Sequence, residues 1–120
     1  LELLTLDQTM AHALAEAGAI HAEDVATSRL RHVLTSALGG DAATPLASPT
    51  DCAWDDVVLL CTDGLTRHVS DDEIAEHLRA PKSAEQTCRD LLALALERGG
   101  RDNITIVNGR LRPLATRRDD

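Results

Sequence analysis

The chain has 120 residues, a formal net charge of -8 and hydrophobic residues at 43% of its positions. This length allows one domain with a single core, and the acidic balance excludes nonspecific binding to nucleic acids or anionic membranes, which requires a basic surface. No apolar stretch approaches the length of a membrane span, and no signal peptide is expected. The three cysteines are an odd number without metal-type spacing, so we predict thiols in a reducing, cytoplasmic location.

The first part of the chain is predicted to contain a strand and two helices. Residues 1–6 have the pattern of the end of a strand. Asp7 stands where it would cap a helix that runs to about Ala17, and Gly18 would end that helix. A shorter helix is expected over residues 22–27, because two acids stand near its positive, N-terminal end.

A strand and an irregular segment are predicted next. Residues 30–38 alternate between two faces, as expected of a strand, and the glycine pair at 39–40 turns the chain. His32 lies within this strand and is interpreted as a packed or hydrogen-bonded residue. Residues 42–54 are rich in Pro, Ser, Thr and Ala without periodicity, which predicts a loop or a weak pair of strands.

An acid closely follows a short apolar run in the middle of the chain. Residues 57–60 are rich in β-branched side chains and predict a strand buried on both faces, with Cys61 as a small core residue. The strand would end at Asp63, because a carboxylate cannot continue into a dry core without a cation or several donors. Gly64 lets the backbone turn and keeps a side chain away from that carboxylate. Asp63 is therefore a candidate metal ligand, although Asp-Gly is also a common turn dipeptide.

Two capped helices are predicted in the C-terminal part. Ser70 and Glu73 have the spacing of a capping box, and the helix that they begin runs to about Arg79. Residues 83–98 form the longest predicted helix, in which the first residue and Gln86 would make a second capping box. The residues expected to pack from these helices are Ile74, Leu78, Leu91, Leu92, Ala95 and Leu96.

A second acid stands just before the last predicted strand, residues 103–111. Asp102 precedes this strand as Asp63 follows the earlier one. If the two strands are antiparallel neighbours, the two carboxylates meet at one rim of the sheet. Carboxylate oxygens are the ligands that Mg²⁺ and Mn²⁺ prefer, and each ion often takes only one or two protein carboxylates. The two acids therefore fit a site for a hard divalent cation.

Four motifs in the chain resemble those of the metal-dependent protein serine/threonine phosphatases of the PP2C or PPM family. They are LTLDQT at residues 4–9, RHVLTSALGG at 31–40, CTDGL at 61–65 and GRDNIT at 100–105. Together they extend the resemblance over about residues 3–111 and place it on the C-terminal half of the family's domain. The family usually has His where this chain has Gln8, a departure that removes a titratable group but not a metal ligand.

The resemblance implies a fold and a chemistry. The family's fold is α+β, an antiparallel β-sandwich flanked by helices, of which this chain would form only the C-terminal portion. Its activity is hydrolysis of phosphoserine and phosphothreonine in proteins by a hydroxide activated by two Mn²⁺ or Mg²⁺ ions. Asp63 and Asp102 would be metal ligands, Gly64 would allow close approach of the ions, and Asn103 would orient Asp102. No further catalytic residue is assigned in this half.

The family's N-terminal half, with its phosphate-binding Arg and its Asp-Gly-His-Gly segment, has no counterpart in the sequence. We therefore expect residues 1–112 to be the C-terminal half of a phosphatase domain, followed by a polar tail at 113–120. The isolated chain should be inactive and bind metal weakly. Its expected partners are phosphoproteins and the missing half. Apolar faces left by that half would favour a homodimer.

Two other interpretations stay open. One is a noncatalytic relative that keeps the fold as a regulatory or binding module. The other is an unrelated α/β module in which Asp63 is an acidic strand-end site, as in receiver domains. Such a module should alternate strands and helices into a parallel sheet, whereas Asp102 here precedes its strand.

Overall fold

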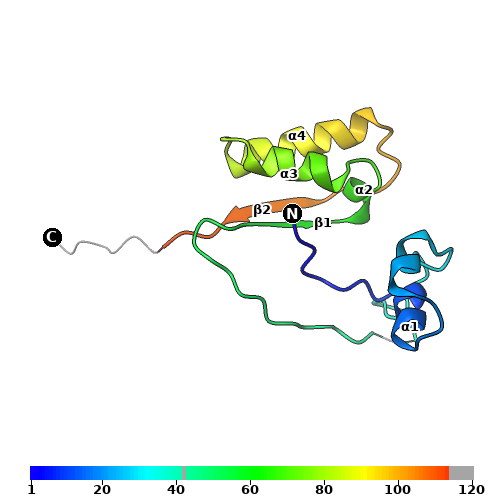
Figure 1. The fold of residues 1–120 in the computed structure, drawn as a ribbon. Coiled ribbons are helices and arrows are strands. Elements are labelled where there is room, and N and C mark those ends of the chain that lie inside the picture. Colours follow the sequence, from blue (N-terminus) through cyan, green and yellow to red (C-terminus); the bar gives the residue numbers. More distant parts are fainter. Residues whose placement is uncertain (42, 114–120) are drawn as a thin grey trace. The chain divides into compact units, whose positions relative to one another are not determined.

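The computed structural model describes residues 1–41 and 43–113, which divide into two units (Figure 1). We call Glu2–Thr50 the N-terminal unit and the described chain from Asp51 onward the C-terminal unit. The tail predicted at 113–120 lies outside the described residues except for Pro113, and so does position 42 of the predicted loop. Within the described ranges, no helix is both long and apolar enough to cross a membrane.

The N-terminal unit contains one short α-helix and one 3-10 helix. α1 spans Met10–Glu16, and the side chain of Thr9 caps it by accepting a hydrogen bond from the backbone N–H of His12 at 3.3 Å. The prediction that Asp7 caps this helix was wrong, because Thr9 still has an extended backbone and the helix cannot begin before it. η1 spans Ala22–Thr27, which are the bounds predicted for the second helix, although it is a 3-10 helix.

The strands predicted at residues 1–6 and 30–38 are not formed in the described chain. Pairing there reduces to a single bridge between Thr9 and Leu34. A strand needs a neighbour along its length to satisfy its N–H and C=O groups, and among the described residues these segments have no such neighbour. Residues 1–6 are therefore irregular, and residues 30–38 form turns and bends around the bridge. Residues 43–54 contain no helix or strand, as predicted for the loop.

The C-terminal unit is organised around two antiparallel strands. β1 spans Val57–Cys61 and β2 spans Ile106–Arg110, in a register that pairs the first residue of each strand with the last residue of the other. Figure 1 shows the two strands side by side, β1 in green and β2 in orange. The predicted α+β class with antiparallel pairing is confirmed, and within the described residues the sheet has these two strands.

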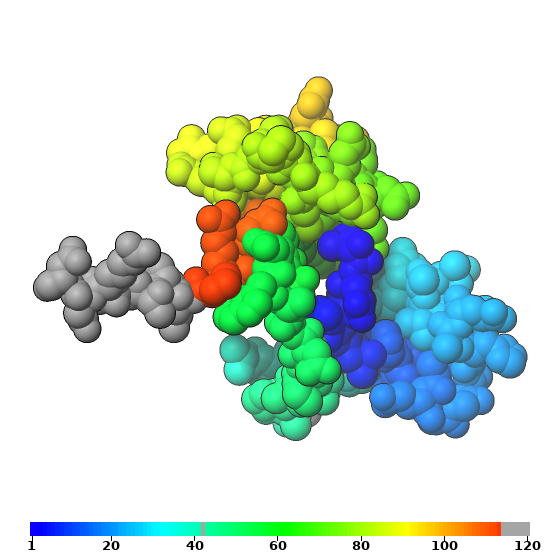
Figure 2. All heavy atoms as spheres, turned by 60° about the vertical axis from the view of Figure 1, so that its left-hand side comes forward, coloured from blue at the N-terminus to red at the C-terminus, as the bar shows by residue number. Residues whose placement is uncertain are grey.

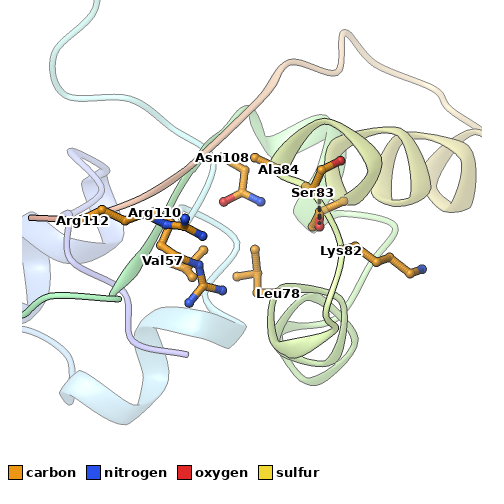
Figure 3. A pocket seen from close by; sticks show the side chains of 9 residues that line it. Val57, Leu78, Lys82, Ser83, Ala84, Asn108, Arg110 and Arg112 are labelled. Atoms are coloured by element: carbon orange, nitrogen blue, oxygen red, sulfur yellow. Dashed lines mark hydrogen bonds between the residues drawn. The ribbon is translucent and has the colours of Figure 1, made fainter. Parts of the chain in front are cut away.

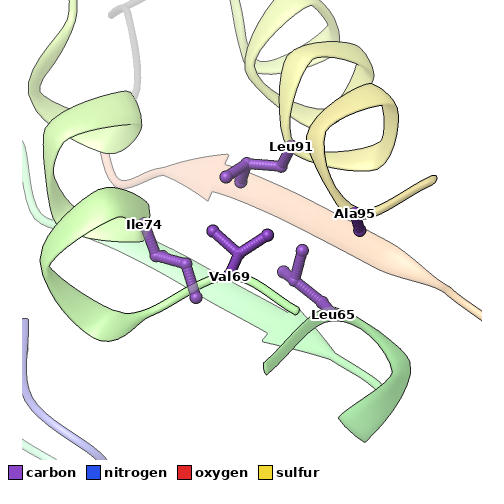
Figure 4. Packing of buried hydrophobic residues seen from close by; sticks show 5 residues of the cluster. All are labelled: Leu65, Val69, Ile74, Leu91 and Ala95. Carbon is purple, nitrogen blue, oxygen red and sulfur yellow. The ribbon is translucent and has the colours of Figure 1, made fainter. Parts of the chain in front are cut away.

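Three helices pack over one face of this strand pair. They are α2 at Asp63–Thr66, α3 at Asp71–Arg79 and α4 at Ala84–Glu97. In the space-filling view, α3 and α4, coloured lime green to yellow, lie along one side of the green and orange strands (Figure 2). Their side chains meet the inner face of β1 and β2 in a small aliphatic core (Figure 4), whose buried members are Leu65, Val69, Ile74, Leu91 and Ala95.

The outer face of the strand pair is exposed in this chain. Leu60 and Val107 stand opposite each other in the register and are 62% and 56% exposed. The prediction that β1 is buried on both faces was therefore wrong, and Cys61 is exposed rather than a core residue. A continuous apolar run shows that both faces of a strand are apolar, but not whether the same chain covers both. The Cys61 thiol is still partly desolvated, which, together with the negative charge of Asp71, raises its pKa.

The first turns of α3 and α4 are both capped by serine. On α3 the predicted capping box is confirmed, since Ser70 and Glu73 each accept a hydrogen bond from the other's backbone N–H. On α4 the side chain of Ser83 accepts from the N–H of Gln86, but the Gln86 amide donates to Asp90 at 2.7 Å instead of closing a second box. A partner one turn further along the helix competes with the cap for this amide.

α4 buries a narrower face than predicted. Leu91 and Ala95 are fully buried, whereas Leu92 and Leu96 are 37% and 55% exposed. The two exposed leucines each follow a buried residue by one position, and this places them about 100° further around the helix.

An ion pair joins the start of α3 to the end of α4. The Arg98 guanidinium donates to both carboxylate oxygens of Glu73 and, at 2.8 Å, to the backbone oxygen of His68. These bonds from Arg98, and further ones from Ser70, hold the pKa of Glu73 well below its usual range. Glu73 therefore serves two purposes, as part of the capping box and as the link between the two helices.

α2 lies against the loop that precedes β2. A Cβ atom added to Gly64 would lie 2.4 Å from the backbone oxygen of Asn103 and 3.1 Å from the side chain of Ile104. The first of these contacts is with a main-chain atom, and the backbone of residue 64 fixes the position of the Cβ atom, so no side-chain rotation can relieve it. A glycine is required for α2 to lie this close to the loop.

Replacing Gly64 by alanine should therefore destabilise the chain by about 1–3 kcal/mol, the usual cost of forcing an extra methyl group into a packed contact. Urea denaturation of the 120-residue chain measures this change. The control is Gly109→Ala in β2, where an added Cβ meets no atom of the described chain within 4 Å, so the change should be smaller than about 0.5 kcal/mol. Equal stabilities of the two variants would show that α2 can move away from the loop at no cost.

The Glu73–Arg98 pair should make stability depend on pH. Because the pKa of Glu73 is lower in the folded chain than in the unfolded chain, its contribution to stability is present above about pH 5 and is lost as the pH falls. The difference in unfolding free energy between wild type and Glu73→Gln should shrink from pH 6 to pH 3. Glu76→Gln, which removes an exposed carboxyl from the same helix, is the control. An equal decline in both comparisons would assign the effect to the overall charge of α3.

Candidate metal centre

The two predicted ligands lie at the same end of the strand pair. Asp63 is the first residue of α2, just beyond the end of β1, and Asp102 lies in the loop between α4 and β2. Because Cys61 pairs with Ile106, the segments that follow β1 and precede β2 are neighbours. The expected meeting of the two acids at one rim of the sheet is therefore observed.

The side chain of Arg67 joins the two carboxylates. Its Nη2 lies 2.7 Å from Oδ2 of Asp63, and its Nη1 lies 2.9 Å from Oδ2 of Asp102. Arg67 follows Asp63 by four residues and is the C-cap of α2, so both side chains project from the same side of this single turn. The side chains of Asp63 and Asp102 are 60% and 38% exposed. One oxygen of each carboxylate thus converges on the same positive charge in a site open to solvent.

Backbone contacts fix the position of Asp102. Its Oδ1 accepts a hydrogen bond from the backbone N–H of Asn103 at 2.8 Å. The hydroxyl of Thr62 donates to the backbone oxygen of Asn103 at 2.9 Å and accepts from the N–H of Thr105 at 3.0 Å. The residue before Asp63 is therefore hydrogen-bonded to the residue after Asp102. The contact that Asn103 makes with Asp102 comes from its main chain, and a role for its side chain stays a prediction.

This arrangement supplies part of a site for a hard cation. Two carboxylate oxygens already contact one cationic group, the guanidinium of Arg67. Oxygen donors of this kind suit Mg²⁺ or Mn²⁺. Within residues 1–41 and 43–113, however, no cluster of three or more His, Cys, Asp or Glu side chains is placed to hold a metal ion. The donors present fit such an ion but leave most of its coordination shell to water or to other groups.

A hollow of about 160 Å³ lies at the opposite end of the strand pair, near Val57 and Arg110 (Figure 3). Lys82 and Ser83, which lead into α4, line it together with Asn108, whose buried Oδ1 has no hydrogen-bond partner among the residues that the structure describes. Neither Asp63 nor Asp102 belongs to its lining. The hollow is therefore separate from the carboxylate pair.

Arg67 and Thr62 are the residues of this site that the sequence reasoning missed. The signal for Arg67 was available, because an acid and an arginine four residues apart on a helix commonly pair. It was overlooked because α2 is only four residues long and shows no periodicity. Nothing in the local sequence indicates that Thr62 bonds across to the second strand.

Comparison with known proteins gives a consistent set of relatives, although no protein-family model matches the chain. The chain is 38% identical over 104 residues to the serine/threonine protein phosphatase PstP of Mycobacterium tuberculosis, a match that covers 87% of this chain and 20% of that protein. It is 33% identical over 105 residues to a putative protein phosphatase 2C-type of Streptococcus pyogenes, covering 87% of this chain and 43% of that protein. The chain thus spans less than half the length of these curated relatives.

Solved structures agree with the sequence matches. The S. agalactiae serine/threonine phosphatase superposes with a TM-score of 0.78 at 29% identity, covering 92% of this chain and 46% of that one. The catalytic domain of PstP in complex with two manganese ions gives a TM-score of 0.69 at 34% identity, covering 92% of this chain and 45% of that one. In sequence and in fold, this chain corresponds to the C-terminal half of the domain of PP2C-type (PPM) serine/threonine phosphatases.

Proposed function

We propose that this chain supplies Asp63 and Asp102 to the binuclear Mn²⁺ or Mg²⁺ centre of a PP2C-type phosphatase that acts on phosphoserine and phosphothreonine in proteins. The observation that carries the proposal is the convergence of these two carboxylates, from segments far apart in the sequence, on a single guanidinium. The manganese complex of the related PstP domain supports the choice of ions.

Each residue has a defined task in this proposal. Asp63 and Asp102 offer oxygens to the ions, while the N–H of Asn103 and the hydroxyl of Thr62 hold the second carboxylate in place. Gly64 keeps the space between α2 and the loop free of side-chain atoms. When bound, such ions activate water and neutralise charge on the phosphoryl group.

The rest of the site must come from outside this chain. Within the described residues only two acids converge, which is too few for two metal ions. We propose that an N-terminal half completes the centre and covers the exposed outer face around Leu60 and Val107. The isolated chain would then be inactive, and in the absence of that half the same face would pair two copies as a homodimer. A cytoplasmic location is part of the proposal, supported by the odd number of cysteines.

A noncatalytic binding module is the second candidate. It is favoured by one observation, namely that Arg67 already neutralises both carboxylates without any metal ion. In such a module the three side chains would simply hold α2 against the loop before β2.

The decisive measurement is Mn²⁺-dependent hydrolysis of a phosphothreonine peptide. A longer protein that joins this chain to an N-terminal half should be active, and Asp63→Asn or Asp102→Asn should lower its rate by about 100-fold or more, because even supporting residues of metal sites cost 10- to 100-fold. The 120-residue chain alone should be inactive.

The matched control is Asp72→Asn, which removes an exposed acid from the first turn of α3 and should leave the rate unchanged. Full activity of both site variants in the longer protein would contradict the assignment of the ligands. Activity of the isolated chain that is lost in Asp63→Asn would contradict the need for a second half. Absence of activity and of metal binding in the longer protein would establish the noncatalytic module.

A further inference from the structure

One cationic side chain occupies the place between the two candidate metal ligands. Arg67 contacts Oδ2 of Asp63 at 2.7 Å and Oδ2 of Asp102 at 2.9 Å. The other oxygen of Asp102 is already engaged by the N–H of Asn103. On Asp102, therefore, the oxygen that contacts Arg67 is the one that the backbone leaves available to a metal ion.

Arg67 and a divalent cation would compete for these oxygens. The guanidinium offsets the mutual repulsion of two carboxylates that converge on one point. A metal ion at the same oxygens would do so more effectively with its double charge, but it would be repelled by a guanidinium that stayed within a few ångströms. The guanidinium and a divalent cation therefore cannot both bind these two carboxylate oxygens at the same time without weakening each other.

Arg67 is free to leave without disturbing the fold. Its side chain is 46% exposed, and in the described part of the chain its ion pairs are with Asp63 and Asp102. It stands at the C-cap of α2, where its backbone N–H donates to the carbonyl of Asp63, and this bond does not depend on the side chain. Exposed ion pairs contribute little individually, so an incoming cation has only a small stabilisation to overcome.

We propose that Arg67 is an internal counter-ion of the metal centre. It holds Asp63 and Asp102 together when no metal is bound, and a divalent cation displaces it into solvent. Arg67 thereby weakens the apparent affinity for the metal and sets the concentration at which the site fills. The proposal rests on the proposed function, because it takes the two carboxylates to be metal ligands.

Mg²⁺ titration of the 120-residue chain by NMR tests this inference at constant ionic strength. Backbone amide signals of Asp63 and Asp102 report binding, and the Nε–Hε signal of Arg67 reports displacement. The amide signals and the Arg67 signal should shift with the same apparent Kd for Mg²⁺. Arg67→Gln should bind Mg²⁺ about three- to tenfold more tightly than wild type, the change expected from losing two exposed ion pairs. Arg67→Lys keeps the charge but cannot contact both carboxylates with separate N–H groups of a planar guanidinium, so its affinity for Mg²⁺ should lie between those of wild type and Arg67→Gln.

The matched control is Arg101→Gln, which removes the same charge beside Asp102 and should change the Kd by less than about twofold. Equal saturable binding by wild type and Arg67→Gln, or an Arg67 signal that does not move while the amides shift, would overturn the counter-ion role and leave the metal site standing. A tightening in Arg101→Gln as large as in Arg67→Gln would also overturn it, by assigning the effect to net charge. Absence of saturable Mg²⁺ binding in every variant would overturn the counter-ion role in this chain, because no cation would then displace Arg67, whereas the ligand assignment in the longer protein is decided by the hydrolysis experiment.

Discussion

The antiparallel pairing of β1 and β2 is the constraint on which the C-terminal unit depends. It brings together two segments that lie more than forty residues apart, and the register of Cys61 with Ile106 decides which residues meet at its end. A shift of one residue would turn Leu59 away from the helices and expose it. The apolar inner face therefore fixes the register, and the register in turn fixes the distance between the two acids.

Much of this arrangement could be predicted from the sequence, because its signals are local. Three kinds of local signal each predict where a strand or helix begins or ends from a few neighbouring residues. They are an apolar run that stops near an acid, a glycine pair before an acid and a strand, and the serine caps at Ser70 and Ser83. Two such signals were enough to predict that Asp63 and Asp102 meet. The metal-binding role of the pair remains a prediction.

What could not be predicted depends on partners that a local pattern does not contain. Residues 30–38 alternate like a strand but pair only through the single bridge between Leu34 and Thr9 in the described chain, and the outer apolar face of β1 is exposed among the described residues. The same holds for Arg67, whose second partner lies across the sheet end. In each case the sequence shows which contacts a segment is able to make, and the tertiary structure determines whether a partner is present to make them.

Thr62 gives the corner between β1 and α2 a mechanical property. Its hydroxyl donates to the carbonyl of Asn103 and accepts from the N–H of Thr105, so one side chain takes the place of a pair of main-chain groups. Since both bonds meet at one rotatable oxygen, turning the side chain away from one partner also loses the other. The start of α2 and the loop before β2 are therefore tied together through this one hydroxyl, one residue before Asp63 and one residue after Asp102. A rotation of the Thr62 side chain would release both acids from their common backbone anchor.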